Sequence, residues 1–240
     1  MQIVGESLCE AAEVLAGETV LDVAAGNGNT SLAAARRFAD VTSTDYVPAL
    51  LEQGRVRADA DRLPIMFRVA DAENLPFPDG SFDVALSSFG VMFAPNQPRA
   101  ATELRRVVKP GGRIGLANWT PDGFVGKMFR VVGRFAPPAP GVSSPLTWGT
   151  EAGLKDLFGA RAADMRIERK RYVFRYLSPE HFVYVFRTYF GPTYKAFAAL
   201  DDDGRREFNG ALIDLLKSEN RSGGPTLVIP AEYIEVVITA

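Results

Sequence analysis

Cysteine and histidine are almost absent from this 240-residue sequence, which holds one of each, Cys9 and His181. One cysteine cannot build an internal disulfide framework, and its scarcity suits the reducing cytoplasm, where we expect this chain to reside. The same scarcity disfavours a zinc site made of Cys and His side chains, and we expect no bound metal. Any Ser-His-Asp triad would have to use His181.

The sequence also lacks a long hydrophobic run and an excess of basic charge. No apolar stretch approaches the length of a membrane-spanning helix, and no signal peptide precedes Ile3, so we expect no membrane partner. Lys and Arg number 27 against 29 Asp and Glu, which gives a net charge of -2. Because nucleic-acid-binding domains are usually basic, we expect no nucleic-acid partner.

The first half of the chain alternates between predicted strands and helices. Strands are expected at 19–24, 41–44, 66–70, 83–87 and 113–118, and helices at 6–15, 30–38, 48–60 and 99–108. Such alternation predicts a Rossmann-like, doubly wound α/β fold with a mostly parallel, seven-stranded sheet and helices on both faces.

The second half is more helical. Helices are expected at 124–135, 151–158, 179–190, 194–200 and 205–217, a strand at 165–176, and closing strand residues at 226–229 and 233–238. This half therefore adds the last strands of the sheet together with a helical insertion.

The segment from Val20 to Thr30 indicates a buried strand, a tight glycine turn and the start of a helix. Gly26 and Gly28 have no Cβ, so the backbone there can take unusual dihedral angles and lie against a ligand. In an open parallel sheet this turn lies in the crevice at the carboxyl ends of the strands, where ligands bind. Asp22 precedes the turn, and its carboxylate would repel a phosphate but suits a cationic ligand with an amino group and a sulfonium.

Three further strand ends bring polar or small residues to the same crevice: Asp45, Asp71 with Ala72, and Ser87. Asp45 ends the strand after the glycine turn, where a carboxylate can accept hydrogen bonds from both hydroxyls of a ribose. The alternative for Asp45 is a solvated turn residue. Asp71 is expected either to accept from the exocyclic amine of adenine or simply to cap a helix.

A glycine turn followed by a ribose-binding acid also describes dinucleotide sites, so a nicotinamide-dependent oxidoreductase is one alternative. Such sites have a third small residue for close helix packing, and Ser31 is a weak match to it. No lysine follows the glycines, which excludes a P-loop for nucleoside triphosphates.

Four segments resemble, in order and spacing, the motifs of class I S-adenosylmethionine-dependent methyltransferases, in the group that includes the ubiquinone and menaquinone methyltransferases. They are residues 21–28 (LDVAAGNG), 71–77 (DAENLPF), 81–87 (SFDVALS) and 103–113 (ELRRVVKPGGR). The resemblance implies S-adenosylmethionine as cofactor, S-adenosylhomocysteine as product, and a small-molecule methyl acceptor. It also implies a single methyltransferase domain over residues 1–240, with a cofactor-binding half, 1–120, and a variable acceptor-side half, 121–240.

The resemblance assigns roles to individual residues of the motifs. The residues implied to bind the cofactor are Asp22, Ala24 and Gly26 at the methionine moiety, Gly28 in the same turn, Asp45 at the ribose, Tyr46 and Leu50 beside the adenine, Asp71 and Ala72 at its edge, and Ser87 near the sulfonium. Glu103 and Arg106 also match motif positions, but we interpret them as structural residues on a helix packed against the sheet.

Two motif segments depart from the family pattern. Ala24 stands where a glycine is common. Ser87-Ser88-Phe89-Gly90 stands where adenine and glutamine amide methyltransferases have Asn/Asp-Pro-Pro-Tyr, which disfavours methylation of DNA adenine. A second alternative is a non-catalytic cofactor-binding protein of the same fold.

The acceptor side of the site is less defined. Phe93 and Trp119 follow predicted strand ends and are our candidates for the acceptor pocket. Methyl transfer needs a general base only when the acceptor must lose a proton, and His181 is the candidate for that role. Because His181 follows Ser178-Pro179-Glu180, its alternative role is at the start of a helix. The sequence leaves the acceptor unidentified and a homo-oligomeric state open.

Overall fold

The chain divides into two compact units in the computed structural model, which describes residues 1–138, 141–159 and 164–240. Unit 1 comprises Met1–Asn118, Ser143–Lys170 and Ile234–Ala240, and unit 2 comprises Trp119–Val142 and Arg171–Tyr233. The single domain expected over residues 1–240 stays a prediction.

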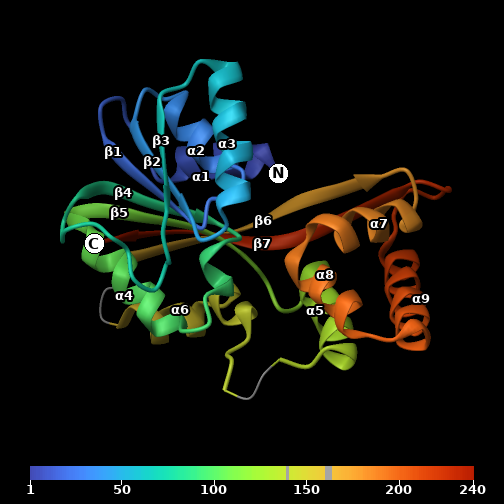
Figure 1. Cartoon of the computed structure of the whole chain (residues 1–240). Helices are drawn as coiled ribbons and strands as arrows, with labels where there is room; N and C mark the ends of the chain where they lie inside the picture. The colour runs from blue at the N-terminus through green and yellow to red at the C-terminus, as the bar shows by residue number, and fades with distance from the viewer. Residues whose placement is uncertain (139–140, 160–163) are drawn as a thin grey trace. The chain divides into compact units, whose positions relative to one another are not determined.

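Within the described ranges, seven strands form one sheet in the order β3-β2-β1-β4-β5-β7-β6 (Figure 1). Their bounds are β1 Thr19–Val23, β2 Asp40–Asp45, β3 Ile65–Val69, β4 Phe82–Ser88, β5 Val108–Trp119, β6 Met165–Tyr176 and β7 Leu227–Thr239. Strand β1 pairs in parallel with β2 and β4, β2 with β3, and β4 with β5. The strand order therefore reverses at β1 and β4, which is the topological switch point where ligands of such sheets bind.

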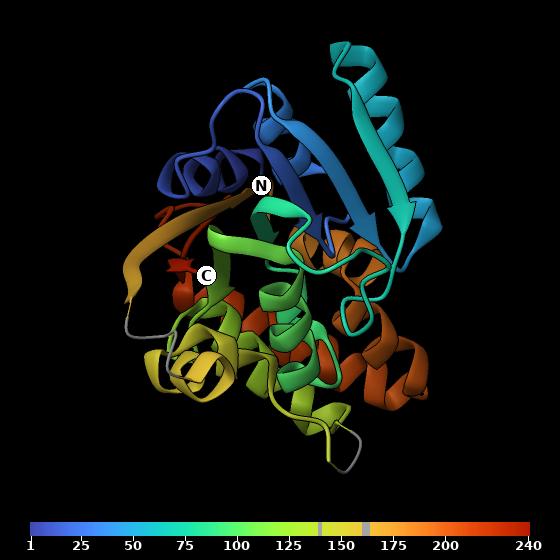
Figure 2. The same ribbon diagram turned by 90° about the vertical axis from the view of Figure 1, so that its left-hand side faces the viewer.

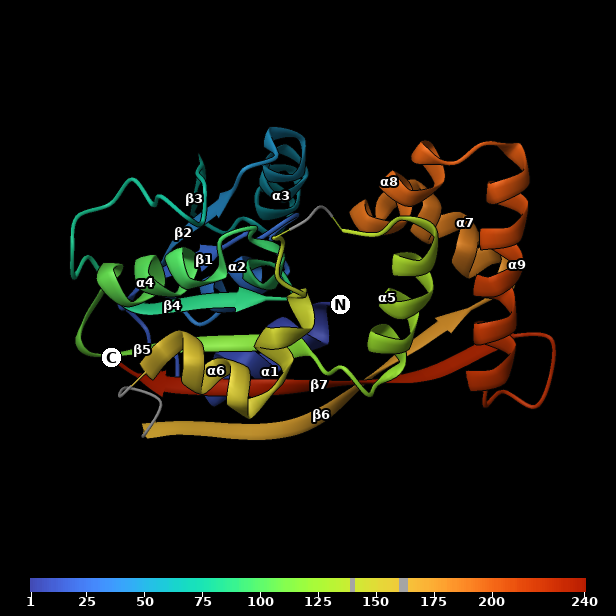
Figure 3. The ribbon, with the colours of Figure 1, turned by 90° about the horizontal axis from the view of Figure 1, so that it is seen from below.

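Helices of unit 1 cover both faces of its strands. They are α1 (Gln2–Ala11), α2 (Asn29–Ala35), α3 (Pro48–Asp61), α4 (Gln97–Val107) and α6 (Glu151–Phe158), with the short 3-10 helices η1 (Val91–Phe93) and η2 (Pro145–Gly149). Figure 3 shows α4 and α6 on the near side of the strands and α1 and α2 on the far side, with the arrow of β7 opposite to that of β4. Figure 2 shows β1, β2 and β3 side by side, with α3 along the outer edge. The Rossmann-like, mostly parallel fold is thus confirmed.

Unit 2 is mainly helical, as expected for the insertion. It holds α5 (Phe124–Phe135), α7 (Pro179–Tyr189), α8 (Gly191–Ala199) and α9 (Asp202–Glu219). Its core is aromatic: the ring of Phe174 lies 5.7 Å from that of Phe182 and 5.8 Å from that of Phe186, centroid to centroid. The tyrosines of α7 and α8 are largely exposed, so the phenylalanines supply the buried face of these helices.

Several predicted boundaries were wrong, most clearly those of the first helix, β5 and β7. The first helix begins at Gln2 and ends at Ala11, because Glu13 has a φ of 51° and the Cys9 carbonyl accepts the Val14 N–H at 3.0 Å. Strand β5 begins at Val108, before its predicted start at residue 113, and continues through Gly111 and Gly112. The two closing strand segments are one strand, β7, which contains Pro230.

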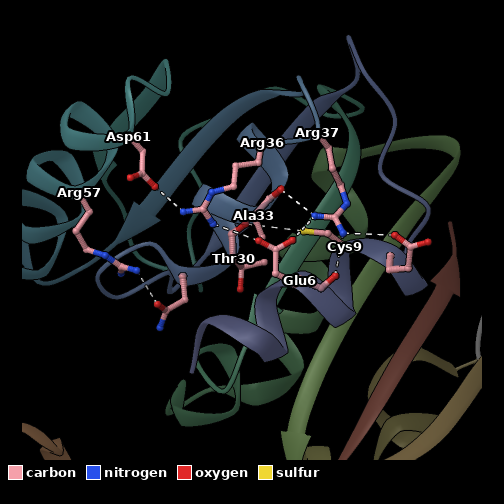
Figure 4. A network of polar contacts seen from close by, with 10 residues as sticks. Glu6, Cys9, Thr30, Ala33, Arg36, Arg37, Arg57 and Asp61 are labelled. Atoms are coloured by element: carbon pink, nitrogen blue, oxygen red, sulfur yellow. Dashed lines mark hydrogen bonds and ion pairs between the residues drawn. The ribbon is translucent and has the colours of Figure 1, made fainter.

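A network of charged residues ties α1 to α2 and α3 (Figure 4). The Arg36 guanidinium contacts Glu6 at 3.2 Å and Asp61 at 2.5 Å, and Arg37 contacts Glu6 at 2.6 Å. These groups are partly exposed to solvent, so each pair stabilises the fold by no more than ~1 kcal/mol. Cys9 lies beneath them, and burial raises the pKa of its thiol to about 12, so it is no nucleophile at neutral pH.

Candidate functional site

The glycine turn bends the chain sharply between β1 and α2. Ala24, Gly26 and Gly28 have φ angles of 53°, 59° and 80°, all in the left-handed region. The Ala25 N–H donates to the Thr44 carbonyl at 2.9 Å, and the Gly28 N–H donates to the Ala25 carbonyl at 3.0 Å. Alternating left-handed residues let the turn curl back on itself beside the end of β2.

Ala24 occupies a strained backbone conformation and lies directly against Gly90. A left-handed conformation favours glycine, which accounts for the glycine common at this position, and it strains alanine by roughly 1–2 kcal/mol. A Cβ at Gly90 would lie 2.2 Å from the Ala24 carbonyl oxygen and 2.7 Å from the Ala24 methyl. Gly90 therefore provides the space that the loop after β4 needs to pass directly over Ala24.

Asp45 connects the glycine turn to the start of α3. One carboxylate oxygen accepts the Gly26 N–H at 2.8 Å, and the other accepts the Val47 N–H at 2.9 Å. Hydrogen bonds from backbone N–H groups to a carboxylate are charge-assisted and short. A single side chain at the end of β2 thus joins the turns that follow β1 and β2.

Asp22 lies beneath the turn rather than on its surface, with none of its area exposed. Its Oδ2 lies 2.6 Å from the Ser31 hydroxyl, and Oδ1 is buried with no hydrogen-bond partner in the described part of the chain. Burial raises the pKa of Asp22 to about 7, against the lowering effect of Ser31 and with a smaller rise from Asp45. In β1, Asp22 is in register with Ser43 of β2 and Leu86 of β4.

Arg57 holds the outside of the same turn, a contact that the sequence analysis missed. Its guanidinium donates to the Asn27 carbonyl at 2.6 Å and to the side-chain oxygens of Asn27 and Asn29 at 3.1 and 3.0 Å. Nearby on α3, a Cβ at Gly54 would lie 3.4 Å from the Asn27 carbonyl carbon. Nothing in the sequence distinguishes Arg57 from Arg55, because only the packing of α3 decides which of them reaches the turn.

Ser87 is fully buried at the end of β4, and its hydroxyl is used twice. It donates to the Val23 carbonyl at 2.7 Å and accepts the Val91 N–H at 3.0 Å. Ser87 therefore fastens β4 to β1 and begins η1. Its predicted position near the sulfonium stays a prediction.

The residues expected around the adenine lie at the carboxyl ends of β2 and β3. Tyr46 is 70% exposed and Leu50 is half-buried on the first turns of α3. Asp71 is exposed and accepts the Glu73 N–H at 2.9 Å, while Ala72 is half-buried beside it. Asp71 thus caps its own turn here, and its contact with adenine stays a prediction.

Glu103 and Arg106 are structural, as expected. Glu103 accepts the buried Leu75 N–H at 2.8 Å. Arg106 pairs with Glu103 at 2.7 Å and donates to the carbonyls of Leu75 and Phe77 at 2.9 and 2.7 Å. Together they secure from α4 the segment that follows Asp71.

The acceptor-side candidates are divided between the two units. Phe93 belongs to η1 in unit 1 and is 37% exposed. Trp119 belongs to unit 2, where it is buried with its ring centroid 5.9 Å from that of Phe174. In the first turn of α7, also in unit 2, the Nδ1 of His181 accepts the Leu177 N–H at 3.3 Å. The roles of these three residues stay predictions.

Comparison with known proteins identifies the family. Residues 21–116 match the family described as "Methyltransferase domain". An uncharacterized protein of Mycobacterium tuberculosis is 40% identical over 200 residues, which cover 82% of this chain and 73% of that protein. A demethylmenaquinone methyltransferase of Deinococcus radiodurans is 37% identical over 127 residues, 50% of this chain and 53% of that protein.

Solved structures support the same fold. The YcgJ protein of Bacillus subtilis aligns with a TM-score of 0.64 at 20% identity, over 99% of this chain and 98% of that one. A putative methyltransferase from Bacillus halodurans aligns with a TM-score of 0.64 at 19% identity, over 98% and 97%.

The strand order reverses at β1 and β4, a left-handed turn follows β1, and an acid ends β2, an arrangement that is typical of nucleoside-binding α/β proteins. Together with the matches above, these features show that the chain belongs to the class I S-adenosylmethionine-dependent methyltransferases. It is an enzyme that transfers a methyl group from S-adenosylmethionine. The findings do not favour the oxidoreductase alternative.

We expect Gly90→Ala to destabilise the protein by about 1–3 kcal/mol, because the new methyl group collides with backbone that has little room to move. The control is Gly133→Ala on α5, where an added Cβ meets nothing within 4 Å and should stabilise the helix by roughly 0.5–1 kcal/mol. Chemical denaturation measures both. Similar small effects at the two positions would contradict the close packing of Gly90 on Ala24.

Asp22→Asn should gain stability relative to the wild type as the pH rises. The pKa of Asp22 is higher in the folded protein than in the unfolded chain, so Asp22 ionises first in the unfolded chain as the pH rises. The free energy of unfolding of the wild type therefore falls as the pH rises from the unfolded pKa to about 7, and Asp22→Asn lacks this loss. Between pH 5 and pH 8 the advantage of the variant should grow by more than about 1.4 kcal/mol, the equivalent of one pKa unit. Denaturant titration at both pH values tests this, with Asp40→Asn, at an exposed site, as control. An advantage that is the same at both pH values would contradict it.

Arg57→Met should loosen the turn and weaken binding of S-adenosylhomocysteine roughly fivefold, which corresponds to ~1 kcal/mol of lost hydrogen bonding. Arg55→Met is the matched control, because Arg55 lies on the same helix over the ring of Phe67 and contacts Glu52 instead of the turn. Calorimetric titration compares the two. Equal losses in both variants would show that the hydrogen bonds of Arg57 to the turn have no specific effect on the site.

Proposed function

We propose that this methyltransferase binds the cofactor in the crevice formed by the turn from Ala24 to Gly28, Asp45 and the end of β4, and methylates a small, partly apolar molecule. The observation that carries the proposal is the Asp45 carboxylate, held by the Gly26 and Val47 N–H groups beside the turn. Each oxygen uses one acceptor position in these bonds and keeps capacity for a ribose hydroxyl.

The other residues of the crevice fit the remaining parts of the cofactor. Glycines at 26 and 28 leave the turn without side chains there, so the backbone can lie against the methionine moiety. The unpartnered Oδ1 of Asp22 adds a buried hydrogen-bond acceptor beneath the turn. Tyr46 and Leu50 would flank the adenine, with Asp71 and Ala72 at its edge and Ser87 on the sulfonium side.

When bound, S-adenosylmethionine supplies an electrophilic methyl group on a positively charged sulfur. The chain's own task is to hold the acceptor atom in line with that carbon at near-attack distance, which can supply roughly 7–11 kcal/mol of the barrier. The bond from sulfur to the methyl carbon breaks with its electron pair left on sulfur, and the bond from the acceptor to carbon forms. An acceptor that carries a proton also releases it, and His181 remains the predicted base for that case.

Two observations support a small acceptor. The similarity to a demethylmenaquinone methyltransferase spans half of this chain, and that protein's name denotes a small-molecule acceptor. The chain's acidic balance disfavours nucleic acid as the acceptor. Among the helices that the structure describes, none has the length and apolar character to cross a membrane.

We expect Asp45→Ala to weaken S-adenosylhomocysteine binding at least tenfold, because both the ribose contact and the link from β2 to the turn are lost. Asp40→Ala is the control, since it makes the same change at the exposed first residue of β2. Calorimetry with the wild type and both variants decides the point. Wild-type protein that binds no S-adenosylhomocysteine would overturn the proposed site.

The acceptor class is tested separately by incubating the wild type and S-adenosylmethionine with a metabolite extract, and by mass spectrometry for products heavier by one methylene. A methylated small molecule that forms with the wild type and not with Asp45→Ala supports the proposal. Cofactor binding without any methylated small molecule would contradict it.

A further inference from the structure

A hollow lies between α1, the first residues of β6 and the last residues of β7. Its volume is about 310 Å³, and the described residues that line it all belong to unit 1. Six of them are polar or charged: Ser7 and Glu10 of α1, Arg166, Glu168 and Lys170 of β6, and Glu235 of β7. Ligand sites begin at about 300 Å³ and are usually apolar, so this hollow suits a ligand that is both small and polar.

Helix α1 has the hollow on one side and the glycine turn on another. Gly5 faces the start of α2, where an added Cβ would lie 2.8 Å from the Asn29 carbonyl oxygen and 3.0 Å from the Thr30 Cα. Ser7 and Glu10 line the hollow instead. The hollow is therefore a separate place from the crevice that we propose for the cofactor.

A buried ion pair lies at the base of the hollow. The Lys170 ammonium is 2.5 Å from Glu235 Oε1, and the side chain of Glu235 is 1% exposed. The Ser7 hydroxyl donates to Glu235 Oε2 at 2.7 Å and accepts from Lys170 at 2.9 Å. Buried ion pairs contribute little net stability, because both ions lose their hydration. Stability alone is thus a weak explanation for this pair, which keeps the base of the hollow polar.

The rim of the hollow carries charges of both signs that can bind further partners. Arg166 donates one N–H to the Ala11 carbonyl at 2.5 Å, and its other N–H groups have no partner among the described residues. The carboxylates of Glu10 and Glu168 make ion contacts of 3.4 Å, and their side chains are 83% and 67% exposed. These contacts are longer than strong charge-assisted hydrogen bonds, so both carboxylates keep capacity for a cation.

We propose that this hollow binds a small zwitterion, a molecule with one carboxylate and one ammonium group. The carboxylate pairs with the free N–H groups of Arg166, whose planar fork matches the two oxygens of a carboxylate. The ammonium group pairs with Glu168 and Glu10. Because three carboxylates and two cations line the hollow, an anion without an ammonium group meets excess negative charge. A cation without a carboxylate leaves Arg166 unpaired.

The experiment is titration calorimetry of the full chain with glycine, 4-aminobutyrate and 6-aminohexanoate as probes. These molecules carry the same two charges at increasing separation, so the tightest of them reports the spacing of the site. Acetate and butylamine carry one charge each and should bind at least about fivefold more weakly than the best zwitterion. Failure of all three zwitterions to bind at millimolar concentrations would overturn the inference, and so would equal binding of acetate or butylamine.

Two variants of the rim locate the bound zwitterion. Arg166→Gln and Glu168→Gln should each weaken binding of the best probe roughly fivefold, the loss expected for one partly exposed ion pair. Arg62→Gln is the matched control, because Arg62 is exposed beside β3, at the opposite edge of the sheet. If either rim variant fails to fold, Glu10→Gln replaces it with the same expectation. Affinity unchanged in the rim variants would place the probe elsewhere and refute the site.

The cofactor crevice is the competing place of binding, because S-adenosylhomocysteine itself ends in an amino-acid group. The titration is therefore repeated with wild type saturated with S-adenosylhomocysteine and with Asp45→Ala, and the zwitterion should bind both with unchanged affinity. A zwitterion that S-adenosylhomocysteine displaces, or that Asp45→Ala no longer binds, occupies the crevice and contradicts the inference. If S-adenosylhomocysteine does not bind at all, the proposed cofactor site fails, while the Arg166 and Glu168 variants still decide on the hollow.

Discussion

The carboxylate of Asp45 is the contact on which the rest of the site depends. Its two oxygens hold backbone N–H groups from consecutive turns of the sheet, so the end of β2 dictates where the chain goes after β1 and where α3 begins. Arg57 and Gly54 of α3 then press against the same turn from outside. The loop after β4 completes the arrangement through Gly90. The turn is therefore shaped by three neighbouring segments as well as by its own glycines.

Much of this arrangement could be predicted because it follows from local pattern. Alternating strands and helices indicated the doubly wound sheet, and acids and serines at the ends of strands indicated which edge holds the crevice. Element ends were less predictable. The first helix stops where a left-handed Glu13 turns the chain, and β7 runs through Pro230, although proline is a poor strand residue. Such features depend on contacts with residues that are distant in the sequence, which a local sequence pattern does not reveal.

Side-chain partners were the least predictable part of the site. Ser31 was noted as a weak match to a small residue, whereas the structure shows its hydroxyl between Asp22 and Ser43. Asp22 lies buried beneath the turn, and its contact with the methionine moiety stays a prediction. Residue type and spacing say which groups reach one edge of a sheet. Whether a given carboxylate meets solvent, a backbone amide or another side chain depends on rotamers and on neighbours distant in sequence.

The path of the chain between the two units has a consequence for how this enzyme can diversify. Unit 2 is built from two separate stretches, Trp119–Val142 and Arg171–Tyr233, and the long strands β6 and β7 each begin in one unit and end in the other. Its helices can lengthen, shorten or exchange residues without interrupting the first five strands of the sheet. Terminal truncation, by contrast, can never remove unit 2 alone, because the last residues of the chain return to unit 1.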